Sequence, residues 1–211
     1  MKILTEYAAE QLLSKSLPVA KSMLAKKAED AAGFAQKTKY PVVLKIISPQ
    51  ALHKTEVSGV KIVRNEAELK SEFNSLLSLA KKKKFKLEGI LAQEFVKGAE
   101  LIIGIKKDAT FGHVLLFGIG GIFVEVLKDV SFRVCPITTN DAEQMIGELK
   151  AKALLFGIRG QKPVNLKLLK EVLVKASKLP ERYPKITELD INPFMLNDKI
   201  GKIADARIIL E

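Results

Sequence analysis

Two carboxylates and an amide follow one another at intervals of two residues near the end of the chain. They are Glu188, Asp190 and Asn192, in the segment 187–193 (TELDINP). Because successive strand side chains point to opposite faces, these three project from one side of a predicted strand. Oxygen ligands without a nearby histidine or cysteine suit a hard cation such as Mg²⁺, which proteins hold by carboxylates together with substrate phosphates. The pattern therefore predicts a magnesium site, or alternatively the ordinary polar face of a half-buried strand.

A lysine interrupts a run of β-branched and apolar residues. Lys45 lies within residues 42–47 (VVLKII), a segment of strand length. Lysine is depleted in strands and costly to bury, unless its stem reaches water or its ammonium meets an anion such as a phosphate. Two interpretations follow: a phosphate-binding lysine, or an edge strand with Lys45 in water.

Two loops carry further groups that could do chemistry. Residues 117–123 (FGIGGIF) place glycines so that backbone N–H groups could approach a ligand, or simply make a tight turn. His53 stands in a polar loop, where it could act as a base or nucleophile or be an ordinary surface histidine. The single Cys135 has no histidine close in sequence and no serine has a nucleophile-elbow context, so hydrolase readings are unsupported.

Alternating helix and strand signals must position these groups. Asn65 with Glu68 three residues later predicts a capped helix that ends near Lys81 to Lys84. The other predicted helices cover about 5–16, 27–39, 139–151 and 165–178, and the predicted strands are 42–47, 60–63, 89–95, 101–105, 114–117, 122–127, 130–134, 186–192 and 202–210. Without repeats or a low-complexity linker, this order predicts an α+β protein of two interlocked lobes, 1–92 and 93–211.

The composition limits the class of protein. The chain has 211 residues, 47% of them hydrophobic, and a formal charge of +11. This charge favours an anionic partner, but the basic residues are scattered and aromatics make up only 6%, which argues against a basic nucleic-acid-binding module. No apolar run approaches the ~18 residues of a membrane span, and the N-terminus lacks a signal-peptide core. With one cysteine, we expect a cytoplasmic protein with no nucleic acid and no membrane partner.

Taken together, these segments resemble one family, the nucleotide-binding β subunit of ADP-forming acetyl-CoA (acyl-CoA) synthetases, which is an ATP-grasp domain. The segments span nearly the whole chain in the family's order: 40–45 (YPVVLK), 47–54 (ISPQALHK), 57–61 (VSGVK), 93–100 (QEFVKGAE), 117–133 (FGIGGIFVEVLKDVSFR), 157–160 (GIRG), 188–193 (ELDINP) and 205–207 (DAR). One departure is Ser58, which stands where a glycine is frequent. The resemblance implies an ATP-grasp fold whose two α+β lobes enclose the nucleotide.

The same resemblance implies roles for individual residues. Asp190 and Asn192, with Glu188, look like the Mg²⁺ ligands, and Arg133 is similar to a phosphate-facing arginine. The implied ADP/ATP-binding residues are Lys45 at the phosphates, Gly59 at the end of the loop that starts at His53 and covers them, Gln93, Glu94, Phe95 and Val96 at the adenine, and Glu100 at the ribose. His53 matches a histidine that the family suggests is transiently phosphorylated.

The implied reaction is acyl-CoA + ADP + phosphate ⇌ carboxylate + CoA + ATP. In this family it passes through an acyl phosphate and a phosphohistidine on a CoA-binding α subunit. The chain leaves no region for CoA binding, so we expect it to need that α subunit, in an α2β2 assembly, for turnover. The β subunit of another ATP-grasp CoA ligase, of the succinyl-CoA synthetase type, is the nearest alternative.

Overall fold

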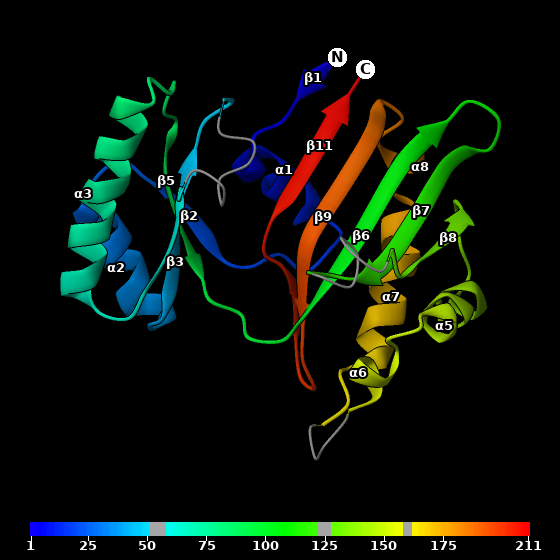
Figure 1. Cartoon of the computed structure of the whole chain (residues 1–211). Coiled ribbons are helices and arrows are strands. Elements are labelled where there is room, and N and C mark those ends of the chain that lie inside the picture. The colour runs from blue at the N-terminus through cyan, green and yellow to red at the C-terminus, as the bar shows by residue number, and fades with distance from the viewer. Residues whose placement is uncertain (51–57, 122–127, 158–161) are drawn as a thin grey trace. The chain divides into compact units, whose positions relative to one another are not determined.

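The computed structural model describes residues 1–50, 58–121, 128–157 and 162–211 (Figure 1). These residues form two compact units: an N-terminal unit of residues 5–7 and 20–95, and a C-terminal unit of residues 1–4, 8–19 and 96–211. The predicted lobes, 1–92 and 93–211, differ from this division mainly at the start of the chain. Residues 1–4 and 8–19 belong to the C-terminal unit because Lys2 and Ile3 pair with its last strand, and Ala9 and Leu13 are buried in its core.

The N-terminal unit is an antiparallel sheet with two helices on one face (Figure 1). Its strands, in sheet order, are β2 (Ser22–Ala25), β5 (Gly89–Glu94), β3 (Val42–Ile47) and β4 (Val60–Val63), and its helices are α2 (Ala28–Thr38) and α3 (Glu66–Lys82). Leu44 and Ile46 pack against Phe73 in the core beneath the helices. The predicted cap is confirmed, because the Asn65 side chain accepts a hydrogen bond from the Glu68 backbone N–H at 2.8 Å.

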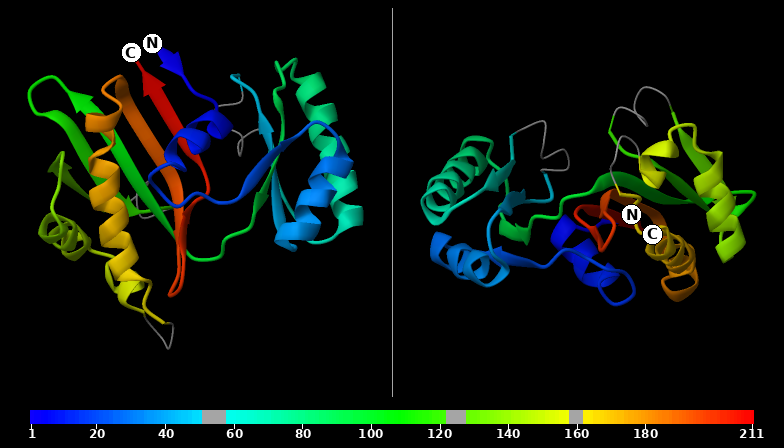
Figure 2. Two further views of the ribbon diagram at one scale, coloured as in Figure 1. Left: turned by 180° about the vertical axis from the view of Figure 1, so that it is seen from behind. Right: turned by 90° about the horizontal axis from the view of Figure 1, so that it is seen from below.

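The C-terminal unit is built on a seven-stranded antiparallel sheet. Its strand order is β1 (Lys2–Ile3), β11 (Ala206–Leu210), β9 (Ile186–Leu196), β6 (Ala99–Asp108), β7 (Gly112–Ile119) and β8 (Val130–Val134), with β10 (Gly201–Ile203) also paired to β9. The helices are α5 (Thr139–Glu148), α6 (Ala153–Phe156), α7 (Leu166–Ser177) and α8 (Leu179–Arg182), while α1 (Glu6–Leu13) begins in the N-terminal unit and continues in this one. Seen from behind, α7 lies across the strands (Figure 2).

The sheet of the C-terminal unit has two unlike faces. Ile103, Leu115 and Leu189 point to the side of α5 and α7 and are buried with Met145 and Leu173. Strand residues one position away in sequence point to the other side, where Phe132 keeps 54% of its surface exposed. We call that second side the open face. It is the side on which two predicted metal ligands of β9, Glu188 and Asp190, lie.

Most of the longer elements agree with the prediction, but the short elements β1, α6 and α8 were not predicted, and the predicted strand 202–210 is two strands, β10 and β11. Strand β2 was missed, because SMLA carries little strand signal. Strand β9 continues past Pro193 to Leu196, and the pairing of β6 with β9 shifts register between Leu101 and Ile103, as at a bulge. The predicted strand 122–127 lies outside the described residues. Within the part of the chain that the structure describes, no helix is both long and apolar enough to cross a membrane.

Candidate functional site

The predicted alternation along β9 is confirmed. Leu189 and Ile191 are buried, whereas Glu188 and Asp190 are half-buried and Asn192 is exposed. The two carboxylates therefore share the open face, and the Asn192 amide comes next to them where β9 approaches its register shift. The polar face that the sequence predicted therefore carries Glu188 and Asp190, whereas Asn192 is exposed at the register shift between β6 and β9.

Asp190 has an unusual pair of strand neighbours. In the register of the sheet it lies between Gly104 of β6 and Arg207 of β11. Gly104 leaves the surface beside the carboxylate bare, and a pocket of about 450 Å³ opens there. Charged side chains line part of the pocket and apolar ones the rest: Glu188, Asp190, Lys106 and Arg207, with Val114, Leu116 and Phe132 among the apolar residues.

Burial and the neighbouring charges together shift the ionisation of Asp190 in this pocket. Burial raises the pKa of Asp190 above its ordinary value, and the Asp205 and Glu188 carboxylates raise it further, although Arg207 acts in the opposite direction. Lys106 lies 3.5 Å and Arg207 4.0 Å from the Glu188 carboxylate. A bound cation would favour the ionised Asp190 that the protein alone disfavours.

The three predicted metal ligands, Glu188, Asp190 and Asn192, suit a hard cation only if the Asn192 amide oxygen takes part. Within residues 1–50, 58–121, 128–157 and 162–211, no three histidine, cysteine, aspartate or glutamate side chains gather as a metal site. A cation at Asp190 and Glu188 would therefore need a further oxygen ligand, for which the sequence predicts Asn192. Mg²⁺ tolerates this, because it is commonly held by one or two carboxylates and completes its shell with water and phosphate.

Lys45 does not lie on an edge strand. Strand β3 is flanked by β5 and β4, so the solvent-facing alternative is wrong. The side chain is buried, and its Nζ lies 2.7 Å from Oε1 of Glu6 in the first turn of α1. Sequence reasoning missed Glu6, because nothing in the local pattern links residues 39 positions apart.

The residues predicted to receive the nucleoside lie where the chain passes from one unit to the other. Gln93 is buried, Phe95 is 39% exposed and Val96 is 6% exposed. The Glu94 carboxylate accepts a hydrogen bond from the Lys21 backbone N–H at 2.6 Å. Glu100 is exposed on β6.

Glycines around these residues permit close backbone contacts. The Glu100 carbonyl accepts a hydrogen bond from Gly120 N–H at 2.7 Å, and a Cβ on Gly120 would lie 3.0 Å from that oxygen. A Cβ on Gly98 would lie 2.4 Å from the Leu196 carbonyl oxygen, so only glycine fits there. Sequence reasoning missed this packing role of Gly98.

The end of the predicted covering loop is tied to β3. The buried Gly59 accepts a hydrogen bond at its carbonyl from Ile46 N–H at 3.0 Å. Ser58 has φ of 57°, a left-handed conformation that favours glycine, which gives a physical reason for glycine at this position in relatives. His53 lies outside the described residues.

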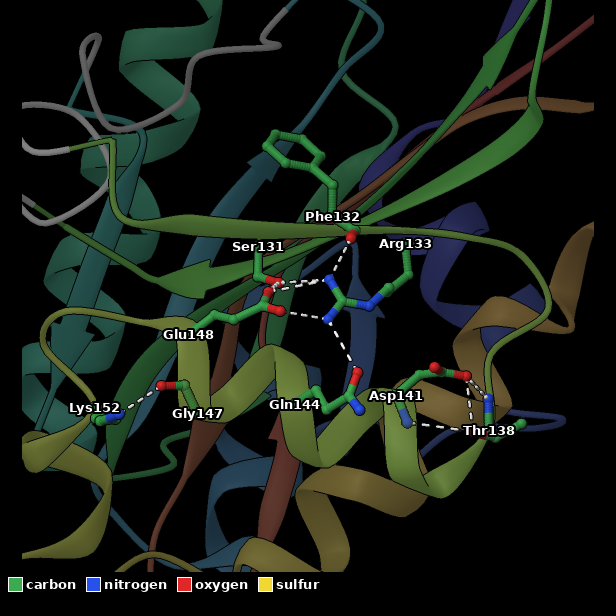
Figure 3. A network of polar contacts seen from close by, with 9 residues as sticks. All are labelled: Ser131, Phe132, Arg133, Thr138, Asp141, Gln144, Gly147, Glu148 and Lys152. Atoms are coloured by element: carbon green, nitrogen blue, oxygen red, sulfur yellow. Dashed lines mark hydrogen bonds and ion pairs between the residues drawn. The ribbon is translucent and has the colours of Figure 1, made fainter.

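Arg133 is placed away from the predicted metal ligands. Phe132 and Arg133 point to opposite sides of β8, and Arg133 faces α5 (Figure 3). Its guanidinium donates to Glu148 at 3.0 Å, to the Phe132 carbonyl at 2.8 Å and to Gln144 at 3.5 Å, and Ser131 donates to the same Glu148 carboxylate. The structure thus places Arg133 on the opposite side of the sheet from Asp190, with its guanidinium bonded to Glu148.

Comparison with known proteins gives a consistent result. A family model described as "ATP-grasp domain" matches residues 1–210. The β subunit of acetate–CoA ligase [ADP-forming] I of Pyrococcus furiosus is 42% identical over 98% of this chain and 91% of its own. The 4-hydroxybutyrate–CoA ligase [ADP-forming] of Nitrosopumilus maritimus is 45% identical over 98% of this chain, which spans only 30% of that relative.

A solved structure agrees over the whole chain. The dinucleotide forming acetyl-coenzyme A synthetase 1 of Ca. Korarchaeum cryptofilum, in complex with coenzyme A, Ca-AMPCP and HgCl⁺, superposes with a TM-score of 0.95 and 43% identity, covering 100% of this chain and 94% of that one. The same protein has also been solved with coenzyme A and Mg-AMPPCP, its phosphohistidine segment pointing towards the nucleotide binding site. With a family model matching nearly every residue, the chain belongs to the ATP-grasp domain family.

Proposed function

We propose that this chain is the nucleotide-binding β subunit of an ADP-forming acyl-CoA synthetase. The reaction is acyl-CoA + ADP + phosphate ⇌ carboxylate + CoA + ATP, completed with a CoA-binding α subunit. The observation that carries the proposal is the pocket on the open face, where Asp190 and Glu188 lie beside Lys106 and Arg207 in a chain that matches β subunits end to end. Carboxylates next to cations suit a metal-bound phosphate chain.

The C-terminal unit supplies the metal ligands in this proposal. Asp190 and Asn192 would hold Mg²⁺, with Glu188 completing the protein's share. The ion, when bound, neutralises charge on the nucleotide phosphates. The raised pKa of Asp190 supports the assignment, because a cation relieves the cost of ionising a half-buried carboxyl group.

The remaining groups bind the organic part of the nucleotide and its phosphates. Lys45 contacts the phosphates, Gly59 ends the segment over them, and Glu100 bonds the ribose hydroxyls. Gln93 to Val96 receive the adenine, for which the exposed Phe95 ring offers an apolar surface. Arg133 is not in this set, because its guanidinium is engaged by α5 on the other face of the sheet.

The phosphoryl group reaches ADP from a histidine. We propose that an oxygen of the ADP β-phosphate forms a new P–O bond to the phosphoryl group of a phosphohistidine while the N–P bond breaks. The products are ATP and a histidine whose imidazole is neutral after proton exchange with solvent. His53 receives the group from the α subunit's phosphohistidine and passes it to ADP, because a neutral imidazole is a competent phosphoryl acceptor near pH 7. The two subunits assemble as α2β2.

Binding and turnover can be tested separately. The chain alone should bind ADP with Mg²⁺ and gain about 2.7 kcal/mol of unfolding free energy at a hundredfold excess of ligand over Kd. With the α subunit and acetyl-CoA, ADP and phosphate, it should form ATP, and native mass spectrometry should give the α2β2 mass. Absence of any Mg²⁺-dependent ADP binding would contradict the proposed function.

The relay through His53 has its own test. His53→Ala should leave Mg-ADP affinity unchanged while ATP formation with the α subunit falls at least about a hundredfold. Acyl phosphate formation, which occurs on the partner, should continue. Near-normal ATP synthesis by this variant would instead indicate direct transfer from the α subunit to ADP.

A further inference from the structure

The pair formed by Glu6 and Lys45 is unusual for its burial. The side chains retain 2% and 7% of their surface exposed, and Nζ to Oε1 measures 2.7 Å. Lys45 points to the side of the β3 sheet opposite α2 and α3, because its neighbours Leu44 and Ile46 belong to the core beneath those helices. The first turn of α1 therefore places Glu6 on the face of the sheet that the two helices leave uncovered.

Stability alone gives no reason to keep an ion pair at this place. Buried ion pairs are often replaced by apolar residues of similar size without loss of stability, because desolvation offsets the attraction. The neighbouring side chains on the same side of the sheet include Ile47 and Leu91, which are apolar and almost fully buried. A lysine and a glutamate at the centre of such a surface point to a use for the charge itself.

The geometry suits a lysine that must act from a fixed position. The stem of lysine is flexible and its ammonium is a point charge with three N–H donors, so orientation has to come from a partner. Glu6 lies in the first turn of α1, where an acidic side chain interacts favourably with the helix dipole. A second hydrogen bond in the N-terminal unit, from the hydroxyl of Thr5 just before α1 to the Glu88 carboxylate at 3.2 Å, also fixes the start of this helix.

We propose that Glu6 is the positioning residue for Lys45, holding its ammonium aimed for a nucleotide phosphate. This inference rests on the proposed function, since it takes Lys45 as a phosphate-binding group. Protein kinases use the same device, in which a glutamate from a helix pairs with the phosphate-binding lysine of a strand. In this chain the glutamate comes from the first helix and the lysine from an interior strand 39 residues later.

The test compares ADP, which has phosphates, with adenosine, which has none, on the full chain in the presence of Mg²⁺. Lys45→Met and Glu6→Gln should each weaken ADP binding by about tenfold or more, the size expected for a hydrogen bond to a charged group. Adenosine affinity should stay within about twofold, because neither side chain contacts the nucleoside in this proposal. Calorimetry measures ADP binding, and ligand-observed NMR measures adenosine binding.

A double-variant cycle separates positioning from general loosening of the fold. In the Lys45→Met background, Glu6→Gln should change ADP affinity by less than about twofold, since no ammonium is left to orient. Thr5→Val is the matched control: it removes the other hydrogen bond at the start of the same helix and should leave ADP affinity unchanged. Should Glu6→Gln not fold, Glu6→Asp replaces it, because the shorter carboxylate draws the ammonium back and should weaken ADP but not adenosine.

The outcomes are distinguishable. If Lys45→Met weakens ADP binding and the folded Glu6 variant does not, Glu6 has no positioning role and the inference is overturned while the proposed function stands. If the Glu6 variant weakens ADP and adenosine equally, its role is structural, and the inference again fails. If Lys45→Met itself leaves ADP affinity unchanged, the assignment of Lys45 in the proposed function is the one that fails.

Discussion

The two faces of the C-terminal sheet use charge in opposite ways. On the helical side, Arg133 and Glu148 neutralise each other, and the hydrogen bond from Arg133 lowers the pKa of Glu148. On the open face, burial and neighbouring carboxylates raise the pKa of Asp190. On the helical side, the charges of Arg133 and Glu148 satisfy one another and join β8 to α5, whereas on the open face a half-buried carboxyl group has a raised pKa, a feature of candidate binding sites. This contrast between the two faces is not visible in the sequence, and it underlies the binding role that we propose for Asp190 and not for Arg133.

The largest expected effect is the loss of Mg²⁺-dependent ADP binding at the open face. Asp190→Asn should weaken Mg²⁺-dependent ADP binding by about a hundredfold, because it removes a charged ligand from a half-buried site. Binding of ADP without Mg²⁺ should change little. Calorimetry with Mg²⁺ and with EDTA checks both expectations, and equal affinities of variant and wild type in Mg²⁺ would refute the metal assignment.

The next largest effect is on the stability of the helical side and not on ADP binding. Arg133→Ala should lower the unfolding free energy by about 1 kcal/mol, since the pair with Glu148 is bidentate but partly exposed, which corresponds to about 2–4 °C in Tm. Mg-ADP affinity of the folded variant should remain that of wild type. Thermal melts and calorimetry provide the two measurements, and a selective loss of ADP affinity would restore the phosphate-facing role predicted from sequence.

The pH dependence of unfolding tests the raised pKa of Asp190 on the open face. Because its pKa is raised in the folded protein, the folded state holds this proton more tightly than the unfolded chain does. The contribution of Asp190 to stability without metal is therefore present below its ordinary pKa and lost as pH rises through the raised one. Asp190→Asn should gain stability relative to wild type between pH 4 and pH 7 in EDTA, measured by urea unfolding, and Mg²⁺ should remove much of this gain. A pH-independent difference would contradict the electrostatic account.

The smallest expected effect is that of replacing Lys106, an exposed residue that lines the pocket on the open face. The Lys106 side chain is 77% exposed and lies 3.5 Å from Glu188, so the pair is well screened by water. Lys106→Met should change the unfolding free energy by no more than about 0.5 kcal/mol. Mg-ADP affinity should shift by at most about threefold and mainly at low salt, which titrations at two ionic strengths would detect. A large, salt-independent loss would place Lys106 among the direct ligands.

Local pattern was a good guide wherever one face of an element is buried. The alternation of β9, the Asn65 cap and the β3 strand follow from side-chain periodicity and capping chemistry, which act between neighbours in sequence. The pattern failed for β2, whose four residues carry little signal, and for residues 8–19, which join the C-terminal unit through contacts distant in sequence.

The sequence by itself determined the family, the fold class and the identity of the oxygen-bearing face, because these depend on local order and on residue types along the chain. Only the tertiary structure decided that Lys45 lies on an interior strand beside Glu6, and that Arg133 faces α5 instead of Asp190. Which strand is interior, and which charge meets which, depends on pairings between segments tens of residues apart. Periodicity along one strand gives two faces but does not say which of them a distant helix will cover.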